Sequence, residues 1–443
     1  MARIFCSKNY KNKEVVFGNS MPVSSLFQAN FEPLALITQI AIILAIGIVA
    51  KALSNKSKAP FVVLLVVLGT IFASAGILNL EILGEWPAII RILALIIIVF
   101  SAGFHLKLKE IQADSRIILS LATLGVFLTL FIISGITFAL LSIPLLSAIV
   151  LGALLSGSDS AAISSVGGTE EKNRVKTILL TESVFNQPLT LILPLVLLDF
   201  LIKPEMAWFN IPKLFAMIGI GLIVGIGGAF WGQKILEASR HKHEQIIGLM
   251  IAIGVYVIAE NFFGSGIVAV AVTALFLSST TKKETHLLGK FTEQLAFLFT
   301  IFVFVMLGMQ FTLGELATLG ITRYEVIVIA VALLIARLVS VGLISYKSSL
   351  GFLDRVKLGL VSPKGIAPAA MAPMFVAYGI TGSDVILKIV YIAVIVSVFL
   401  SMVAFGFSSG KKTVKEKRAE KSEDRKIKRE EKARKAENGK LKK

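Results

Sequence analysis

The sequence has little charge and almost no cysteine. Only 16% of its 443 residues are Asp, Glu, Lys or Arg, whereas 56% are hydrophobic, and the mean hydropathy is +0.83. A soluble domain carries about 25% charged residues, so this composition excludes a soluble enzyme and a disordered chain. The single cysteine, Cys6, excludes an intrachain disulfide and a cysteine-rich metal site. A polytopic helical membrane protein remains.

The positive charge is concentrated at one end of the chain. The formal net charge is +17, and the segment from Lys411 to Lys443 carries +9 of it, from 16 Lys and Arg against 7 Asp and Glu. We therefore expect a basic tail on an apolar body and no nucleic-acid partner. The tail can contact anionic lipid at the inner membrane surface, although a solvated extension is the simpler interpretation.

Long uncharged runs predict thirteen membrane spans. A spanning helix needs about 20 mostly apolar residues, and runs such as Pro33–Ala50, Ala59–Leu80 and Gln294–Gly314 fit this length. The run Ile117–Ser158 is 42 residues long and contains Pro144, so we interpret it as two helices joined by a tight turn. The predicted fold class is an all-α polytopic membrane protein with its membrane domain at residues 33–407.

The loops predict how the chain is oriented in the cell membrane. Short cytoplasmic loops carry an excess of Lys and Arg. Six alternate loops hold 18 such residues, and the loops between them hold 5. This alternation places the tail, residues 408–443, in the cytoplasm and the N-terminal segment, residues 1–32, outside the cell. The N-terminal segment carries four cations of its own, which go against this orientation.

Four ionisable side chains fall inside the predicted spans, namely Asp159, Glu182, Arg337 and Lys364. A charged group at membrane depth is costly, so its presence points to function. Asp159 follows a Ser-Gly-Ser stretch that weakens its helix, and Lys364 follows Pro363. We expect both helices to be interrupted there.

The twelfth span is expected to be broken by several residues, because proline removes an amide donor and clashes with the preceding turn. Irregular backbone is tolerated at membrane depth only where it lines a cavity or is buried in protein. Paired interruptions in two halves of a chain predict inverted repeats with a transport site near the bilayer midplane. The alternative is a pair of packing kinks with an adventitious salt bridge. The expected breaking residues are Pro363, Gly365, Pro368 and Pro373.

The sixth span carries polar side chains at helical spacing. Glu182 and Asn186 are four residues apart and share a face, and three more polar residues form the neighbouring face. Oxygen ligands of this kind can replace the hydration shell of a monovalent cation. We expect Asp159 and Gln187 to be the ligands of that cation. The full candidate ion-binding and transport set is Ser158, Asp159, Glu182, Ser183, Asn186, Gln187 and Lys364, with Thr190 beside it.

These residues resemble the monovalent cation:proton antiporter superfamily, the sodium/proton exchangers. The resemblance covers roughly Pro33–Phe407 and depends on the order and spacing of several short motifs. The family's order of threonine-aspartate, glutamate-serine and asparagine-aspartate reads here as Ser158-Asp159, Glu182-Ser183 and Asn186-Gln187. The other matching motifs are FSAGFHLKL at Phe100–Leu108, Gly264–Ala269 after Glu260, Phe302–Gly308, Arg337, and Pro363-Lys364-Gly365.

The resemblance implies thirteen helices, with core and dimerisation helices and two crossing discontinuous helices. It implies exchange of Na+, or of Li+ or K+, for H+ by movement of the core against a dimeric scaffold. The protein would then be a homodimer in a lipid bilayer, with no cofactor and no enzymatic activity. The family pattern also implies that Glu182 pairs with Lys364, and that Arg337 is a structural charge holding neighbouring helices.

Gln187 departs from the family pattern, in which an ion-binding aspartate occupies this position. An amide can ligate a cation but does not titrate. One hypothesis is that Asp159 replaces the missing aspartate. A second is that Lys364 carries the proton, because a desolvated lysine can lose its proton and an arginine cannot.

The departure leaves other classes open beside a coupled antiporter. One is a transporter of the same fold with altered coupling or substrate, such as an uncoupled or anion-linked carrier. Another is a sensor or scaffold that keeps the fold without transport. An intramembrane enzyme is excluded, because Asp159 lacks the sequence of an aspartyl-protease pair and no histidine lies in the middle of a span.

Overall fold

The structure is a computed structural model that describes residues 23–57, 59–104, 108–141, 143–159, 162–163, 174–202, 207–239, 243–280, 286–314, 322–346, 348–380 and 382–409. Most of the predicted N-terminal segment and nearly all of the basic tail lie outside these residues. Their predicted positions on either side of the membrane therefore stay predictions.

Thirteen apolar helices are present in the described part of the chain. Nine are long and apolar enough to cross a membrane, and four are shorter, in agreement with the thirteen predicted spans. The nine belong to α1 (Val23–Ser57), α3 (Trp86–Phe104), α4 (Leu108–Ser120) continued by η2 (Leu121–Gly125) and α5 (Val126–Leu141), α8 (Arg174–Ile202), α9 (Ala207–Ala238), α10 (Glu244–Asn261), α12 (His286–Met309), α14 (Arg323–Ser345) and α17 (Ser383–Ser409). The four are α2 (Phe61–Ser74), α6 (Leu145–Leu154), α11 (Gly266–Thr280) and α16 (Ile366–Ala377), and α15 (Phe352–Leu360) precedes α16.

Helices form because hydrocarbon offers backbone amides and carbonyls no water to bond. The spans differ in how deeply they are buried. The α8 span has a mean hydropathy of only 1.3, and 71% of it is buried inside the protein. The α9 span is more apolar, at 1.9, and only 22% of it is buried. Helix α8, which carries Glu182, Asn186 and Gln187, is thus kept from lipid by its neighbours.

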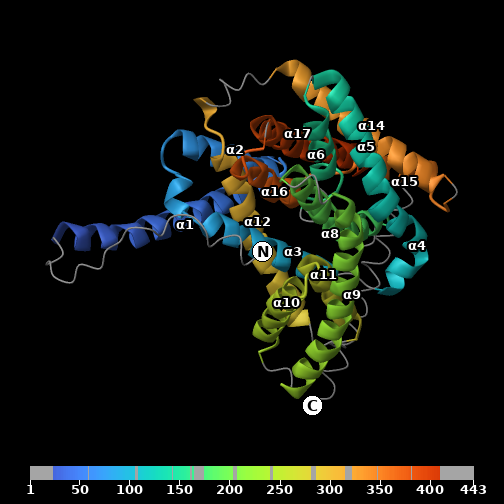
Figure 1. Cartoon of the computed structure of the whole chain (residues 1–443), viewed down its shortest axis with the longest axis horizontal. Coiled ribbons are helices and arrows are strands. Elements are labelled where there is room, and N and C mark those ends of the chain that lie inside the picture. Colours follow the sequence, from blue (N-terminus) through green and yellow to red (C-terminus); the bar gives the residue numbers. More distant parts are fainter. Residues whose placement is uncertain are drawn as a thin grey trace, which may run out of the picture.

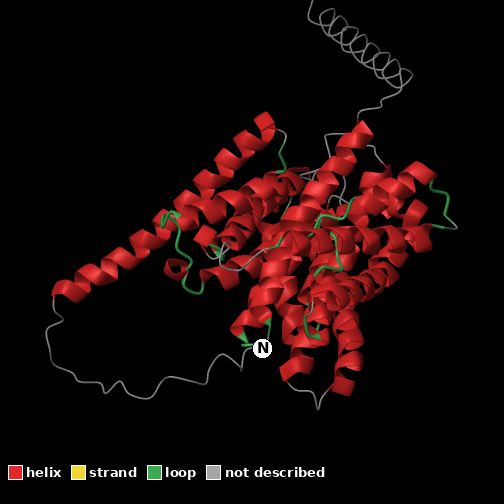
Figure 2. Ribbon diagram, turned by 90° about the horizontal axis from the view of Figure 1, so that it is seen from above, coloured by secondary structure: helices red, strands yellow, loops and turns green. Residues whose placement is uncertain are grey.

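By their strongest contacts the helices, labelled in Figure 1, fall into two groups that also touch each other. In one group α12 packs against α2 and α3, and α11 packs against α9, α3 and α10. In the other group α5 packs against α6 and α14, while α14 packs against α15 and α16 against α17. Helix α8 contacts members of both groups. The long helix α1 extends outward from the remaining helices in both views (Figure 2).

Helices α2 and α12 cross closely at Gly69 and Gly308. A Cβ atom on Gly69 would lie 2.5 Å from the carbonyl oxygen of Val305, so only glycine fits there. Beside this crossing, Thr70 Oγ1 lies 3.0 Å from the carbonyl oxygen of Gly308 and 3.0 Å from the hydroxyl of Tyr391 on α17. The crossing therefore also supports a polar contact between the two helix groups.

Two helices are interrupted, as the sequence predicts. Regular helix ends at Leu154 in α6, and the chain is non-helical through Asp159. The second interruption separates α15 from α16 and comprises Val361–Gly365. The amide of Asp159 donates to the carbonyl of Pro363 at 3.0 Å, so the two interruptions meet.

Two of the residues expected to break the twelfth span do not break it. Pro368 and Pro373 both lie within α16. Pro368 is the third residue of that helix, where its missing N–H would have had no partner in the helix. Pro373 lies inside the helix, and neighbouring spans can satisfy the backbone that a proline frees. The expected turn at Pro144 is confirmed, because α5 ends at Leu141 and α6 begins at Leu145.

We predict that Gly308→Ala destabilises the protein by about 1–3 kcal/mol, because a methyl group there must push α2 away from α12. The measurement is the thermal unfolding midpoint of purified protein in detergent. Gly342→Ala on α14 is the matched control, because nothing lies within 4 Å of a Cβ at that position. Equal midpoints for the two variants would contradict the close crossing.

Candidate ion-binding site

All eight side chains that the sequence singles out are buried, and none is more than 6% exposed. They come from the first interruption, from α8, from α14 and from the second interruption. The buried set is Ser158, Asp159, Glu182, Ser183, Asn186, Gln187, Arg337 and Lys364. Residues far apart in sequence are thus all buried in the protein.

The two interruptions contact each other through main chain and side chain. Besides the bond from Asp159 N to Pro363 O, the ammonium of Lys364 donates to the carbonyl of Gly157 at 2.8 Å. It also donates to Ser362 Oγ at 3.0 Å. A Cβ on Gly365 would lie 2.5 Å from Asp159 Cγ, so only glycine allows this approach. Each interruption therefore supplies partners for the other.

Asp159 also begins the helical turn that follows the first interruption. Its Oδ1 accepts from the amide of Ala162 at 2.9 Å, and its carbonyl accepts from the amide of Ile163 at 2.9 Å. This is how an aspartate caps a helix N-terminus. One carboxylate oxygen of Asp159 is thereby engaged by the backbone.

Glu182 pairs with Arg337, and the expected pairing with Lys364 is wrong. Two guanidinium nitrogens of Arg337 donate to the two carboxylate oxygens of Glu182, each at 2.6 Å. A planar guanidinium matches a carboxylate with two parallel bonds, which an ammonium cannot do. Arg337 Nε donates to the carbonyl of Leu358 at 3.2 Å, so this cation also holds the last turn of α15.

The Glu182–Arg337 pair determines how Asn186 is oriented. A carboxylate only accepts hydrogen bonds, so Asn186 must turn its NH₂ group toward Glu182. Asn186 Nδ2 lies 3.5 Å from Glu182 Oε1 and donates to Ser158 Oγ at 3.0 Å. The carbonyl oxygen Oδ1 of Asn186 then points elsewhere, and it has no hydrogen-bond partner among the described residues.

Gln187 shows the same feature. Its side-chain oxygen Oε1 is buried and has no hydrogen-bond partner in the described part of the chain. By contrast, Ser183 Oγ donates to the carbonyl of Leu180 at 2.7 Å within α8. Thr190 lies against the first interruption, because a Cβ on Gly157 would be 2.5 Å from its methyl carbon. Asn186 and Gln187 thus offer buried acceptor oxygens, whereas the hydroxyl hydrogen of Ser183 is used within its own helix.

Two residues of the site were missed by the sequence analysis. Ser397 and Ser401 of α17 accept hydrogen bonds from the amides of Lys364, at 2.8 Å, and of Ser362, at 3.3 Å. The only available signal was a pair of serines four residues apart in an apolar span. Such serines commonly bond their own helix, so the spacing did not single them out.

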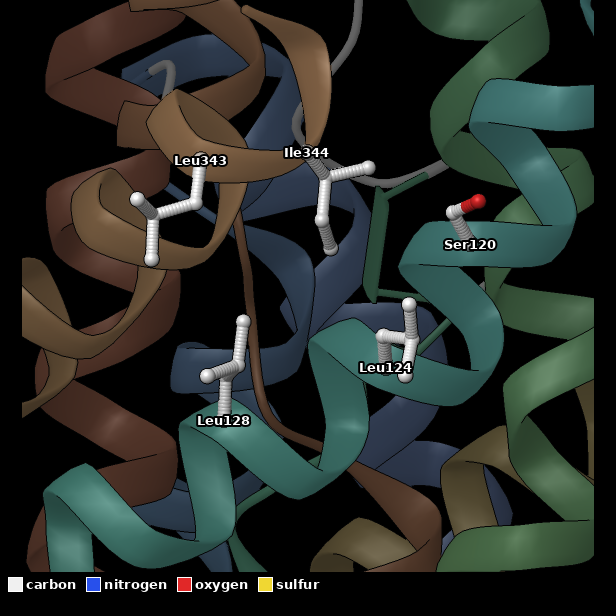
Figure 3. A pocket seen from close by; sticks show the side chains of 5 residues that line it. All are labelled: Ser120, Leu124, Leu128, Leu343 and Ile344. Carbon is white, nitrogen blue, oxygen red and sulfur yellow. The ribbon is translucent and has the colours of Figure 1, made fainter.

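The structure also has an open apolar cleft, and none of the candidate site residues lines it. An apolar cleft of about 450 Å³ lies between η2 with its flanking helices and α14, lined by leucine and isoleucine side chains and by Ser120 (Figure 3). A much smaller cavity, about 10 Å³, lies beside Arg337, Ser362, Ser397 and Ser401. The described residues contain no group of three or more His, Cys, Asp or Glu that could hold a metal ion.

Comparison with known proteins places the chain in a family. A model of the family described as "Sodium/hydrogen exchanger, transmembrane" matches residues 19–406. The chain belongs to the sodium/hydrogen exchanger family. This match confirms the resemblance seen in the sequence. The family's members are transporters and not enzymes.

Individual relatives differ in the cation that their names give. The K(+)/H(+) antiporter NhaP2 of Shewanella oneidensis is 24% identical over 375 residues, 81% of this chain and 64% of NhaP2. A protein of Methanocaldococcus jannaschii named "Probable Na(+)/H(+) antiporter 2" is 28% identical over 354 residues, 76% of this chain and 83% of that protein. The chain thus spans slightly less than two thirds of NhaP2.

The exchanger fold is also seen in a solved structure. The sodium proton antiporter MjNhaP1 from Methanocaldococcus jannaschii superposes with a TM-score of 0.69, covering 84% of this chain and 96% of that one at 22% identity. The likeness confirms the predicted fold class, an all-α membrane protein with inverted repeats and two crossing discontinuous helices.

We predict strong energetic coupling between Glu182 and Arg337. Removing one partner of a buried ion pair costs about 3–5 kcal/mol, because the other charge is left uncompensated. A double-mutant cycle with Glu182→Gln and Arg337→Gln, followed by thermal unfolding, should give a double variant far more stable than the sum of the single losses implies. The matched cycle with Glu182→Gln and Lys364→Gln should show weaker coupling. A larger coupling in the second cycle would restore the pairing that the family pattern implies.

Proposed function

We propose that this exchanger moves Na+ in one direction and protons in the other across the cell membrane by alternating access. The observation that carries the proposal is the pair of buried oxygens, Asn186 Oδ1 and Gln187 Oε1, without hydrogen-bond partners in the described residues. A buried polar atom left unpaired costs about 1–3 kcal/mol. A dehydrated cation would use such oxygens as ligands. Li+ or K+ could use them too, so the cation is an outcome of the experiment.

Asp159 is proposed as the carboxylate that takes either the cation or the proton. Competition between the two for one carboxylate couples the two fluxes, and Gln187 cannot provide it because an amide does not titrate. Glu182 is a poorer candidate, because both of its oxygens are engaged by Arg337. Asp159 lies at the crossing of the two interruptions, where its amide donates to Pro363 O and its Oδ1 accepts from the amide of Ala162.

Lys364 provides a second route for the proton. Its two side-chain partners, the carbonyl of Gly157 and the hydroxyl of Ser362, are both neutral. A neutral amine could donate to the same two oxygens, so loss of the proton would leave these contacts in place. The two routes make opposite predictions for substitutions at Asp159 and Lys364.

We also propose a homodimer in the lipid bilayer with the basic tail in the cytoplasm. The spans of α1 and α9 support this, because only 28% and 22% of them are buried within one chain. Apolar surface of this extent can pack against a second copy. The count of Lys and Arg in alternate loops supports the orientation, with the N-terminal segment outside.

The decisive experiment is proton flux in proteoliposomes under imposed Na+, Li+ or K+ gradients. Wild-type protein should move protons in response to at least one cation, most strongly Na+. Asp159→Asn should lower the rate by about tenfold or more, which is ~1.4 kcal/mol in the barrier. If Asp159→Asn retains full exchange and Lys364→Gln abolishes it, the second route is right. If both variants keep full exchange, neither assignment survives.

A transporter with altered coupling is the second candidate, and the observation that favours it is Gln187 itself. By the resemblance seen in the sequence, this residue stands where the family has its titrating aspartate, and it is buried next to Asn186 in the chain. Gln187→Asp distinguishes the candidates in the same vesicles. If cation-dependent proton movement occurs only in this variant and wild type still carries the cation, the native chain is an uncoupled carrier; if wild type carries neither ion, it is a sensor or scaffold. If wild type already couples the two fluxes, the antiporter stands.

A further inference from the structure

Two amides of the second interruption find their partners on α17. The chain is non-helical from Val361 to Gly365, and within it the amide of Val361 still donates to the carbonyl of Lys357 at 3.2 Å. Pro363 has no N–H to satisfy. The amides on either side of it, those of Ser362 and Lys364, donate to Ser401 Oγ at 3.3 Å and to Ser397 Oγ at 2.8 Å. Both serines are buried, at 1% and 3% exposure.

The spacing of the two serines fits the spacing of the two amides. Four residues of α-helix rise about 6 Å, and two residues of extended chain span at most about 6.6–7.2 Å. Ser397 pairs with the later residue, Lys364, and Ser401 with the earlier one, Ser362. The interruption therefore runs antiparallel to α17 and in register with it. A shift by one residue would place Pro363, which has no donor, opposite a serine.

The hydroxyl of Ser397 is itself oriented by its own helix. Ser397 Oγ donates to the carbonyl of Val394 at 3.1 Å, so its hydrogen is used and a lone pair faces Lys364 N. At the other end of the same residue, Lys364 Nζ bonds Gly157 O and Ser362 Oγ. Ser362 is thus held by its amide and in turn holds the ammonium of Lys364.

We propose that Ser397 and Ser401 are positioning residues that fix the height of Lys364 in the membrane and thereby place its ammonium against the first interruption. The charged side chains that act on the Lys364 ammonium are then Asp159 at the crossing, Glu182 on α8 and Arg337 on α14. This inference deepens the proposed function, because it names the residues that hold the charge at the proposed ion site. The serines act through Lys364 and need not touch the transported ion.

The test is a pair of variants of equal size at Ser397. Threonine and valine have nearly the same volume and differ in the hydroxyl, so Ser397→Thr keeps the hydrogen-bond acceptor that Ser397→Val removes. We expect the pH profile of exchange in proteoliposomes to stay near wild type in the first variant. In the second variant we expect the profile to move by at least about half a pH unit and the maximal rate to fall about tenfold.

The matched control is the same pair at Ser134 on α5. This serine is also buried, but in the described part of the chain its hydroxyl donates to the carbonyl of Leu130 in its own helix. Threonine and valine at Ser134 should give the same pH profile. If Ser397→Thr and Ser397→Val share one pH profile and one rate, and differ only in thermal stability, the serines are structural caps and the proposal is wrong.

Failure of the proposed function can be told apart from failure of this inference. Should wild-type protein move no cation, the thermal unfolding midpoints still test whether Ser397 acts through Lys364. The midpoint difference between Ser397→Thr and Ser397→Val should become smaller without disappearing when Lys364→Gln is added, because glutamine keeps the amide that bonds Ser397 Oγ and loses only the ammonium that this bond positions. An unchanged difference in that background would overturn the inference even if transport is intact.

Discussion

At membrane depth every backbone group needs a hydrogen-bond partner, and this constraint shapes the centre of the protein, by which we mean the two interruptions with Glu182 and Arg337 beside them. Two helices are interrupted in the interior, at Leu155–Asp159 and at Val361–Gly365, and water cannot satisfy the amides that they release. Each interruption therefore finds partners on other elements: Asp159 N on Pro363 O, and the second interruption on the serines of α17. The two interruptions, the helices that they break and α17 must therefore keep one relative arrangement. The polar side chains of α8 are buried beside the first interruption.

The charges at the centre balance in a way that bears on exchange. Asp159 and Glu182 offer two negative charges, and Arg337 and Lys364 two positive ones, all at most 5% exposed. The desolvation penalty of a buried ion is several kcal/mol even after relaxation, so a surplus charge there is strongly disfavoured. Because Arg337 and Glu182 form a closed pair and an ionised Asp159 has no proton to lose, a cation that enters adds a surplus charge unless a proton leaves Lys364. A buried neutral centre thus favours exchange over simple uptake.

Much of this arrangement could be predicted from the sequence, because residues that lie in the membrane must be mostly apolar and uncharged. Uncharged runs located the spans, and a Ser-Gly-Ser stretch and Pro363 located the two interruptions. The partner of Glu182 could not be found in this way, since Glu182 lies 155 residues from Arg337 and 182 from Lys364 in sequence and only packing decides between them. Pro368 and Pro373 misled the analysis because a proline ends a helix only where its context leaves the freed backbone unsatisfied. Ser397 and Ser401 gave no signal distinct from ordinary serines in a span.

The second interruption is held by neighbouring helices as well as by the first interruption, and this bears on how the contacts around Lys364 could change when an ion binds. The second one is fixed from outside by α17 through Ser397 and Ser401, and Arg337 holds the helix before it at Leu358. Contact between the interruptions includes one backbone bond, the ammonium of Lys364 on Gly157, and the absence of a side chain at Gly365. A lysine side chain has four rotatable bonds, so its contact can change without moving either backbone. The scaffold around Lys364 can therefore stay intact while the ammonium, the carboxylate of Asp159 and an arriving cation redistribute their contacts.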